Sequence, residues 1–335
     1  MKKMRILFRL VLLLCLVLVA AAATAWYWTN RPVTLTAQRL DYLVEVGSRP
    51  RTVARTMAKA GIQINEDAFV LLARLTGLDK QIKAGGYEAV RGDTPLMLLE
   101  RMASGDMTQT RITLVEGWTY ARIRQALRDN PQIKHTLDQT SDAELLKRLG
   151  SDQTSPEGLF FPDTYVFVPD SADFDILRRA YHASQQQLAS IWDERDPNLP
   201  ISTPYQALIL ASLIEKETGV AADRRRIAGV FINRLRLDMP LQTDPSVIYG
   251  MGDAYKGKIR KSDLAADTPW NTYTRTGLPL TPIACPGRAS LLAAVHPENH
   301  NYLYFVSRGD GTSEFSKDLP EHNRAVSKYI LKANQ

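Results

Sequence analysis

The sequence predicts an α+β fold that is preceded by a transmembrane helix. An uncharged run covers residues 10–28, and from residue 41 onward short alternating segments lie between helical ones. A third observation is an almost wholly apolar helical segment, residues 204–214, which leads into two glutamates. A chain of 335 residues is long enough for two or three domains. We expect a basic cytoplasmic end at 1–9, a transmembrane helix at 10–28, a linker at 29–40, a small module at 41–108, an intermediate α+β region at 109–200 and a larger core domain at 201–335.

The amino-terminal run predicts a single membrane anchor. Its 19 residues, from Leu10 to Trp28, would cover most of a hydrocarbon core about 30 Å thick at about 1.5 Å per residue. Small residues at Ala23-Thr24-Ala25 leave a cleaved signal peptide as the alternative. We expect an uncleaved anchor, because the run is long and ends in aromatic residues typical of a membrane interface. Basic residues precede it and place the amino end in the cytoplasm, with the rest in the periplasm or outside: Lys2, Lys3, Arg5 and Arg9.

Charge, cysteine positions and histidine spacing argue against nucleic-acid binding, an intrachain disulfide and a zinc site. The basic end supplies four of the six net positive charges, so the remainder is close to neutral, which argues against a nucleic-acid partner. Cys15 falls in the predicted membrane segment and Cys285 outside it, so we expect no intrachain disulfide. His296 and His300 flank Pro297, and their spacing is not that of a helical zinc motif. We therefore expect neither a metal nor a cofactor.

Residues 41–108 predict a small module with a strand, two helices and a second strand. Residues 42–46 alternate as a strand does, and residues 53–60 and 67–78 have helical spacing. A glycine-broken strand follows at 82–90, and a further helix at 95–102. This order resembles a LysM-like unit, a class of module that binds glycan chains. A spacer that sets the distance from the membrane is the alternative.

Residues 109–200 predict further alternation before the core domain. Strands are expected at 111–117 and 166–168, and helices at 119–127, 142–149 and 173–192. Two prolines near residue 200 then separate this region from the core domain.

The apolar helix of the core domain has a clear start. Thr203 is a good N-cap, Pro204 suits the first helical position, and Gln206 completes a capping-box pattern. Nearly every residue up to Ile214 is apolar or small, so we expect the helix to be buried on most sides. Gly219 is a plausible stop.

Two glutamates, Glu215 and Glu217, fall in the last turn of this helix. The helix dipole is negative there, so a partly desolvated carboxylate should have a raised pKa and be protonated more often than a free one. A protonated carboxylic acid in a cleft is what the cleavage of a glycoside needs as its general acid. The alternative is a solvated helix end, with Lys216 between the two acids.

The rest of the core domain predicts a polar groove. A helix is expected at 223–237, with Asn233 beside its apolar face to hold either a sugar or the backbone. Residues 241–288 are loop-rich, and long structured loops are usually binding or lid segments. A helix at 289–295, a strand at 302–306 with a turn at 309–311, and a helix at 322–332 close the chain. Amide, hydroxyl and aromatic side chains suit a sugar groove, and the loop-rich stretch offers Gln242, Thr243, Tyr249, Asn271, Thr272 and Tyr273.

Several long motifs in order resemble one family. They include Lys-Ala-Gly-Gly-Tyr (83–87), Leu-Val-Glu-Gly (114–117), Phe-Pro-Asp-Thr-Tyr (161–165), Ala-Ser-Leu-Ile-Glu-Lys-Glu-Thr (211–218), Val-Phe-Ile-Asn-Arg-Leu (230–235), Leu-Gln-Thr-Asp-Pro-Ser-Val-Ile-Tyr-Gly (241–250), Asn-Thr-Tyr (271–273), Gly-Leu-Pro (277–279) and Tyr-Leu-Tyr-Phe-Val (302–306). Together they resemble the YceG-like family of endolytic murein transglycosylases over essentially the whole chain. Departures are local, at Leu280-Thr281 and Cys285.

The resemblance implies an activity and a set of site residues. Members cleave the MurNAc–GlcNAc bond inside peptidoglycan strands and leave a 1,6-anhydro end. The catalytic glutamate is the second of the pair, Glu217, on a lysozyme-like glutamate-bearing helix in a mixed catalytic domain. It serves as general acid and then as base, and Glu215 would be either structural or a modest electrostatic neighbour. Cell-wall synthases (penicillin-binding proteins) are the implied partners. The candidate substrate-binding residues are Asn233, Gln242, Thr243, Asp244, Tyr249, Asn271, Thr272, Tyr273 and Leu278.

Two other functions stay open from the sequence. A two-carboxylate hydrolase would use Asp244 to activate a water molecule. A membrane-tethered scaffold would bind glycan and recruit synthases without turnover.

Overall fold

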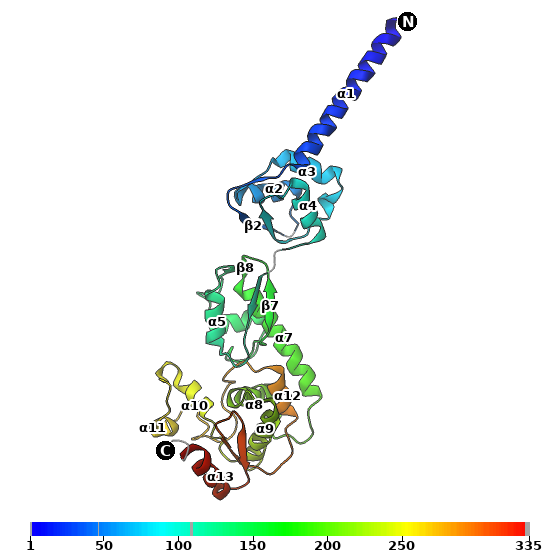
Figure 1. Ribbon diagram of the computed structural model, residues 1–335. Helices are drawn as coiled ribbons and strands as arrows, with labels where there is room; N and C mark the ends of the chain where they lie inside the picture. Colours follow the sequence, from blue (N-terminus) through cyan, green and yellow to red (C-terminus); the bar gives the residue numbers. More distant parts are fainter. Residues whose placement is uncertain (1, 46, 108–109, 332–335) are drawn as a thin grey trace. The chain divides into compact units, whose positions relative to one another are not determined.

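The computed structural model describes residues 2–45, 47–107 and 110–331 (Figure 1). It confirms a mixed α+β fold. The chain divides into two compact units, one of Met1–Arg111 with Val166–Ser171 and one of Ile112–Tyr165 with Ala172–Gln335. The finer predicted domain boundaries stay predictions. Three predicted element or domain ends, at Val46, at 108–109 and at Lys332, lie outside the described residues.

The amino-terminal run lies in helix α1, Lys2–Asn30, which extends beyond both ends of the predicted segment. Across the described residues, no helix combines the length and the apolar character needed to cross a membrane. Near the end of α1, Trp26 and Tyr27 are exposed, whereas Trp28 packs against the core of the first unit.

The first unit is built around one antiparallel strand pair. Strand β2, Arg39–Val44, pairs with β4, Gly85–Val90, in a register that sets Tyr42 opposite Tyr87. The centroids of these two rings are 6.0 Å apart, and both side chains are buried. Directly opposed side chains on one face of a sheet make its main stabilising contacts, so this pair fixes the register.

Helices of the first unit cover this strand pair in the predicted order of strand, helix, helix and strand. The helices between the strands are α2, Pro50–Lys59, and α3, Glu66–Leu75; η1, Leu78–Lys80, follows, and α4, Pro95–Ser104, comes after β4. Part of the predicted linker is itself a strand, because β1, Thr34–Leu35, pairs with β3, Ile62–Gln63. Glycan binding by this module stays a prediction.

Residues 110–193, most of which belong to the second unit, form short elements that lead into a long helix. Asp173 joins the two, since its carboxylate accepts hydrogen bonds from the backbone N–H of Thr136 and Leu137 while lying at the start of the long helix. The elements are β5, Thr110–Thr113; α5, Tyr120–Arg128; β6, Ile133–Lys134; α6, Asp142–Leu149; β7, Thr164–Phe167; β8, Ser171–Ala172; and α7, Asp173–Asp193.

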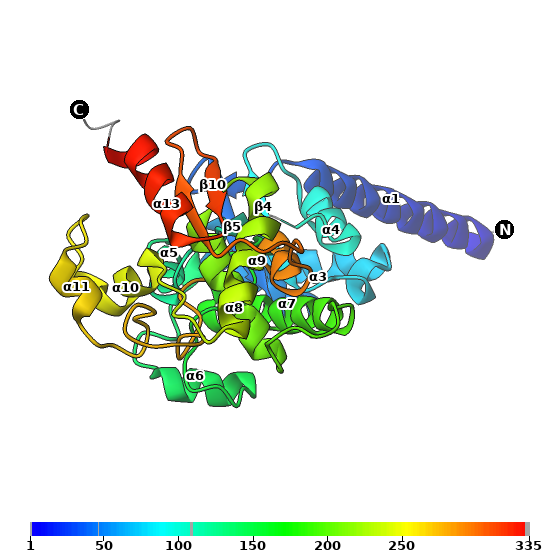
Figure 2. The same cartoon turned by 90° about the horizontal axis from the view of Figure 1, so that it is seen from below.

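Helix α8, Pro204–Glu217, lies at the centre of the second unit (Figures 1 and 2). It contacts α7 and also α9, Ala221–Arg236, α10, Asp244–Met251, and α12, Arg288–Val295. Residues 207–214 are all buried, as the apolar run predicts. Burial on all sides makes α8 the element against which the other helices of this unit are positioned.

The capping of α8 follows the prediction with one shift. Thr203 accepts a hydrogen bond from the N–H of Gln206. The Gln206 side chain accepts from the N–H of Ser202 instead of from that of Thr203, so the reciprocal bond closes one residue earlier. The helix ends at Glu217, two residues before Gly219, so both glutamates lie in its last turn.

The loop-rich stretch 241–288 contains short helices that the sequence pattern did not reveal. These are α10, η2, Gly252–Ala254, and α11, Lys261–Ala265, and each spans too few turns to produce a helical period. Further on, β9, Tyr304–Ser307, forms an antiparallel hairpin with β10, Ser313–Ser316, a strand that was not predicted. The described chain ends in α13, Leu319–Val326, and a π-helical turn, Ser327–Leu331.

Gly229 provides a test of how closely α9 approaches the 298–300 segment. A Cβ atom at this position would lie 2.4 Å from the carbonyl oxygen of Glu298 and 2.6 Å from Nε2 of His300. Alanine is otherwise favoured over glycine in a helix by about 1 kcal/mol. We predict that Gly229→Ala instead lowers the free energy of unfolding by about 1–3 kcal/mol, measured by chemical denaturation.

Gly219→Ala is the matched control, because a Cβ atom there would meet nothing within 4 Å. Its stability should stay within about 0.5 kcal/mol of the parent. Equal stability of the two alanine variants would contradict the close approach.

Candidate active site

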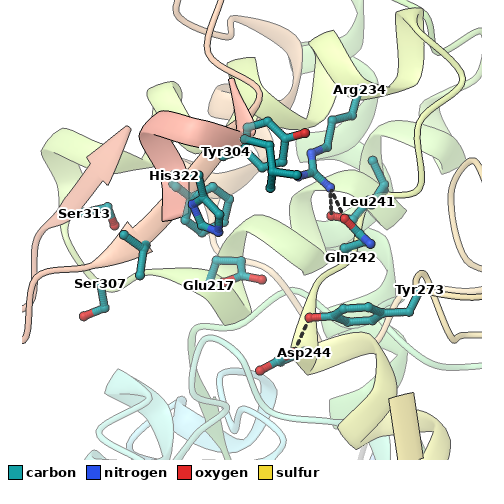
Figure 3. Close-up of a pocket in the computed structure, with 13 residues that line it drawn as sticks. Glu217, Arg234, Leu241, Gln242, Asp244, Tyr273, Tyr304, Ser307, Ser313 and His322 are labelled. Carbon is teal, nitrogen blue, oxygen red and sulfur yellow. Dashed lines mark hydrogen bonds between the residues drawn. The ribbon is translucent and has the colours of Figure 1, made fainter. Parts of the chain in front are cut away.

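One cavity of the second unit collects several of the predicted residues (Figure 3). Its volume is about 400 Å³. It lies between the end of α8, the carboxyl half of α9, the segment that leads into α10, the β9–β10 hairpin and α13. The residues that line it are Glu217, Arg234, Leu241, Gln242, Asp244, Tyr273, Tyr304, Phe305, Val306, Ser307, Ser313, Leu319 and His322.

Glu217 lies at the carboxyl end of α8 with its side chain toward the cavity (Figure 3). Its Oε1 accepts a hydrogen bond from the Thr243 hydroxyl. The pKa of the Glu217 carboxyl is raised to about 7: burial is the largest cause, the Thr243 hydrogen bond opposes it, and the nearby charge of Asp244 adds to the rise. The expected upward shift is therefore present.

Thr243 is held by a buried hydroxyl network behind the cavity. Its N–H donates to Oγ1 of Thr272 at 3.0 Å, and Ser246 donates to the carbonyl oxygen of Thr243 at 2.7 Å. The hydroxyls of Ser246 and Thr272 are 2.8 Å apart. All three residues are at most 2% exposed. Thr272 was a predicted substrate contact, but here it lies behind the residue that touches Glu217 and positions it.

A second carboxylate, Asp244, faces the same cavity from the start of α10. Its Oδ1 accepts a hydrogen bond from the Tyr273 hydroxyl at 2.5 Å. Burial and the neighbouring charge of Asp244 raise the pKa of Tyr273, so its hydroxyl keeps its proton and remains a donor. This pair brings together two predicted residues that are 29 positions apart in the sequence.

Arg234 forms another wall of the cavity. Its Nη1 donates to the carbonyl oxygens of Pro240 and Leu241 and to Oε1 of Gln242. Gln242 has a φ of 52°, a left-handed conformation that a residue with a side chain rarely adopts. Its N–H donates to the carbonyl oxygen of Thr272 at 3.0 Å, so bonds at both ends hold this strained residue in place.

Besides Thr243 and Thr272, which lie behind the cavity, four other predicted residues do not line it. The amide of Asn233 donates to the carbonyl oxygens of residues 300 and 302, which is the backbone role that the sequence left open. The Asn271 amide likewise serves backbone carbonyls of the 264–266 turn. Tyr249 donates to Glu157 at 3.1 Å, and Leu278 lines a separate pocket beside Trp270. Contact of these four with substrate stays a prediction.

Glu215 has a different environment from Glu217, although both end the same helix. Its Oε2 accepts a hydrogen bond from the N–H of Gly287 at 3.0 Å. A Cβ atom at Gly287 would lie 1.9 Å from Oε1 of the exposed Glu116 side chain, which would have to move aside. Glu215 thus fastens the 287 loop to α8 and is not among the residues that line the cavity.

Among the cavity residues that the sequence did not predict are three with large polar or aromatic side chains. Arg234 directly follows Asn233, and Tyr304 lies in a strand that was predicted only as an element. His322 lies on α13, and its ring stacks on that of Tyr304 with centroids 5.2 Å apart. The sequence predicted the strand that carries Tyr304 and the helix that carries His322. Only the fold shows that these two residues lie in the same cavity as Glu217.

A second buried acid, Glu157, was also missed. It is 4% exposed and accepts hydrogen bonds from the N–H groups of Tyr120 and Gly158 and from the Tyr249 hydroxyl. Burial raises its pKa to about 7. Glu157 does not line the cavity. Its hydrogen bonds connect the start of α5 to Tyr249 of α10.

The fold and the site define a class of protein: an α+β protein whose central buried helix presents one protonatable glutamate to a polar, aromatic cavity. Comparison with known proteins is specific. Residues 42–328 match the YceG-like family, and the chain belongs to that family.

Relatives extend over most of this chain. The endolytic murein transglycosylase of Bacillus subtilis (strain 168) is 34% identical over 307 residues, which cover 86% of this chain and 84% of the relative. The endolytic murein transglycosylase of Streptococcus pneumoniae serotype 2 is 25% identical over 85% of this chain, which spans 57% of that relative. A crystal structure of a YceG-like protein from Listeria monocytogenes aligns with a TM-score of 0.55 at 28% identity, and covers 86% of this chain and 98% of its own.

The raised pKa of Glu217 has a consequence for stability. The unfolded carboxyl has a pKa near 4.5 and the folded one near 7, so the folded state holds the proton more tightly. The free energy of unfolding should then fall as the pH rises from about 4.5 through 7. We predict that Glu217→Gln flattens this fall by up to about 3 kcal/mol, measured by denaturation at pH 5 and pH 8.

Glu157→Gln is the matched comparison, since the same sign of shift applies to a second buried acid outside the cavity. Each variant should remove only its own part of the pH dependence. An unchanged slope in Glu217→Gln would show that Glu217 does not hold a proton at neutral pH.

Proposed function

We propose that this protein is a lytic transglycosylase that cleaves the glycan strands of peptidoglycan internally at the MurNAc–GlcNAc bond, with Glu217 as its catalytic residue. The observation that carries the proposal is the cavity in which Glu217, with a pKa of about 7, is the acid at the end of the buried helix. Family membership and the names of the relatives support the substrate and the reaction.

The geometry of Glu217 fits a residue that acts first as acid and then as base. Its Oε1 is occupied by the Thr243 hydroxyl, which leaves Oε2 to carry the proton. In the first step the acid gives this proton to the leaving glycosidic oxygen. The resulting carboxylate then accepts the proton of the 6-hydroxyl group of the same MurNAc, whose oxygen attacks the anomeric carbon. A pKa near 7 suits both steps at neutral pH.

Asp244 and Gln242 are each held by a hydrogen bond from a neighbouring side chain, and both could assist Glu217 in the reaction. The carboxylate of Asp244, which is held by Tyr273 at the wall of the cavity, would supply negative charge to stabilise a transition state with oxocarbenium character. Gln242, held by Arg234, offers its amide N–H₂ group to a sugar oxygen. No water is required as nucleophile, so one acid suffices.

Replacement of the acid tests the proposal directly. We predict that Glu217→Gln lowers the rate of glycan cleavage at least about 100-fold, because the amide carries no transferable proton. The measurement is digestion of purified sacculi with mass analysis of the products, in which the wild-type protein yields 1,6-anhydro ends. Circular dichroism and thermal unfolding confirm that the variant is folded.

Glu215→Gln is the control, since this side chain ends the same helix but is bonded to the 287 loop. It should retain cleavage. Wild-type rates from Glu217→Gln would remove the assignment. Reducing ends in place of anhydro ends, lost in Asp244→Asn, would establish the two-carboxylate hydrolase. Full complementation of a deletion by Glu217→Gln would establish a non-catalytic scaffold.

Membrane attachment and synthase partners are further parts of the proposal. The uncharged run of residues 10–28, preceded by basic residues, supports a single anchor with the second unit on the outer face of the cytoplasmic membrane. Tethering would place the cavity next to new glycan, where synthases work.

Extraction tests the anchor. We predict that the full chain stays in the membrane pellet after washing with alkaline carbonate, whereas a chain that starts at residue 30 is released into the soluble fraction. Release of the full chain by carbonate would exclude an integral anchor.

A further inference from the structure

The cavity contains a buried positive charge that no described side chain neutralises. Arg234 is only 6% exposed, and no described carboxylate lies within ion-pair distance of its guanidinium. Burial lowers the pKa of Arg234, which reflects the unfavourable transfer of its charge out of water. A buried charge without a counter-ion is costly, so its presence in a binding cavity points to a ligand.

The guanidinium of Arg234 is only partly used by the fold. Nε donates to the carbonyl oxygen of Leu303 at 2.7 Å, and Nη1 donates to three oxygens of the 240–242 segment. None of the hydrogen bonds among the described residues involves Nη2, which carries two N–H groups. Arg234 therefore has donors left for an anion.

The neighbours of Arg234 extend the same polar region. Its guanidinium carbon lies 4.9 Å from the centroid of the Tyr304 ring, on which the His322 ring stacks. Nδ1 of His322 is buried and has no hydrogen-bond partner among the described residues. The acids that share the cavity, Glu217 and Asp244, lie away from Arg234 in Figure 3. Among the described residues, the cavity thus holds unpaired donor groups of Arg234 and His322 in addition to its two acids.

We propose that Arg234, supported by Tyr304 and His322, binds a carboxylate carried by the lactyl substituent of a muramic residue and so selects muramic glycans over neutral ones. This inference rests on the proposed function, whose substrate carries such carboxylates. A planar guanidinium recognises carboxylates by paired N–H donors, and the low dielectric of a buried site strengthens the bond. The anion comes from one of two sources: the lactyl group itself where the peptide has been removed, or the stem peptide attached to it.

The test compares ligands with and without this carboxylate, and one pair, the peptide-free acid and its methyl amide, differs chiefly in the charge. The protein is the full chain in detergent with Glu217→Gln, which stops turnover while binding is measured by calorimetry. The probes have equal chain length: muramic oligosaccharides without peptide, the same with stem peptides, the peptide-free form with its carboxylates converted to methyl amides, and chito-oligosaccharides.

We expect a carboxylate-bearing probe to bind at least about tenfold more tightly than both neutral ones. Tighter binding of the peptide-free form assigns the lactyl carboxylate, and tighter binding of the other assigns the stem peptide. Adding Arg234→Gln should bring the affinities for the carboxylate-bearing and the neutral probes to within about twofold of each other. Arg124→Gln is the matched control, because Arg124 also lies over a tyrosine ring and donates to a backbone carbonyl, but outside this cavity.

His322→Gln keeps the inference testable if Arg234→Gln does not fold, and it should reduce the preference by about threefold. The ligand series needs no variant at this site. Equal binding of the methyl amides and the carboxylates, or no binding of any probe, would overturn the inference. It would leave the proposed function standing if the wild-type protein still cleaves sacculi, whereas failure of cleavage would overturn that function separately.

Discussion

The second unit depends on burying a carboxyl group at the end of its central helix. Desolvation disfavours the charged form of Glu217 and raises its pKa to about 7. That condition requires α8 to be enclosed on nearly every side, which four neighbouring helices accomplish. The same enclosure would be harmful to stability if the acid had to be ionised. The fold therefore accepts a destabilising group at the one position where a proton donor is useful, as functional sites often do.

Support for the acid comes from residues that never reach the cavity. The hydroxyl of Thr243 contacts Glu217, but its orientation is set by Ser246 and Thr272, which are fully buried. Glu157 acts in a similar way on a larger scale, since it joins the start of α5 to Tyr249 of α10. Hydrogen bonds behind a reactive group limit its rotation, and this rigidity keeps the acid and its neighbours in one geometry.

Local signals in the sequence predicted the helices that carry their own caps. Helix α6 has the predicted bounds, because Ser141 caps its start and Gly150 adopts the left-handed conformation at its end. The start of α8 followed from Thr203 and Pro204 for the same reason. Short elements such as α11 and β10 escaped, since five or four residues give no period.

The site was predictable only where its residues lie close to a recognisable pattern. The two glutamates stand out at the end of an apolar helix, and Gln242 to Asp244 lie in a polar loop. Tyr304 and His322 reach the same cavity from positions 87 and 105 residues after Glu217. Tertiary packing brings such distant residues together, and the spacing of residues within one segment cannot predict it. Asn233 shows the converse, since a polar residue on a helix beside the site turned out to serve the backbone.

Arg234 is connected to the segment that contacts the catalytic acid by hydrogen bonds as well as by its charge. Its Nη1 holds the carbonyl oxygens of Pro240 and Leu241, and the chain then continues through Gln242 to Thr243, which touches Glu217. An anion bound at Nη2 would draw on the same guanidinium that fixes this segment. Binding of an anion and the position of Glu217 would therefore be coupled through the consecutive residues Leu241, Gln242 and Thr243. A neutral side chain could fill the space of Arg234 but could not make that connection.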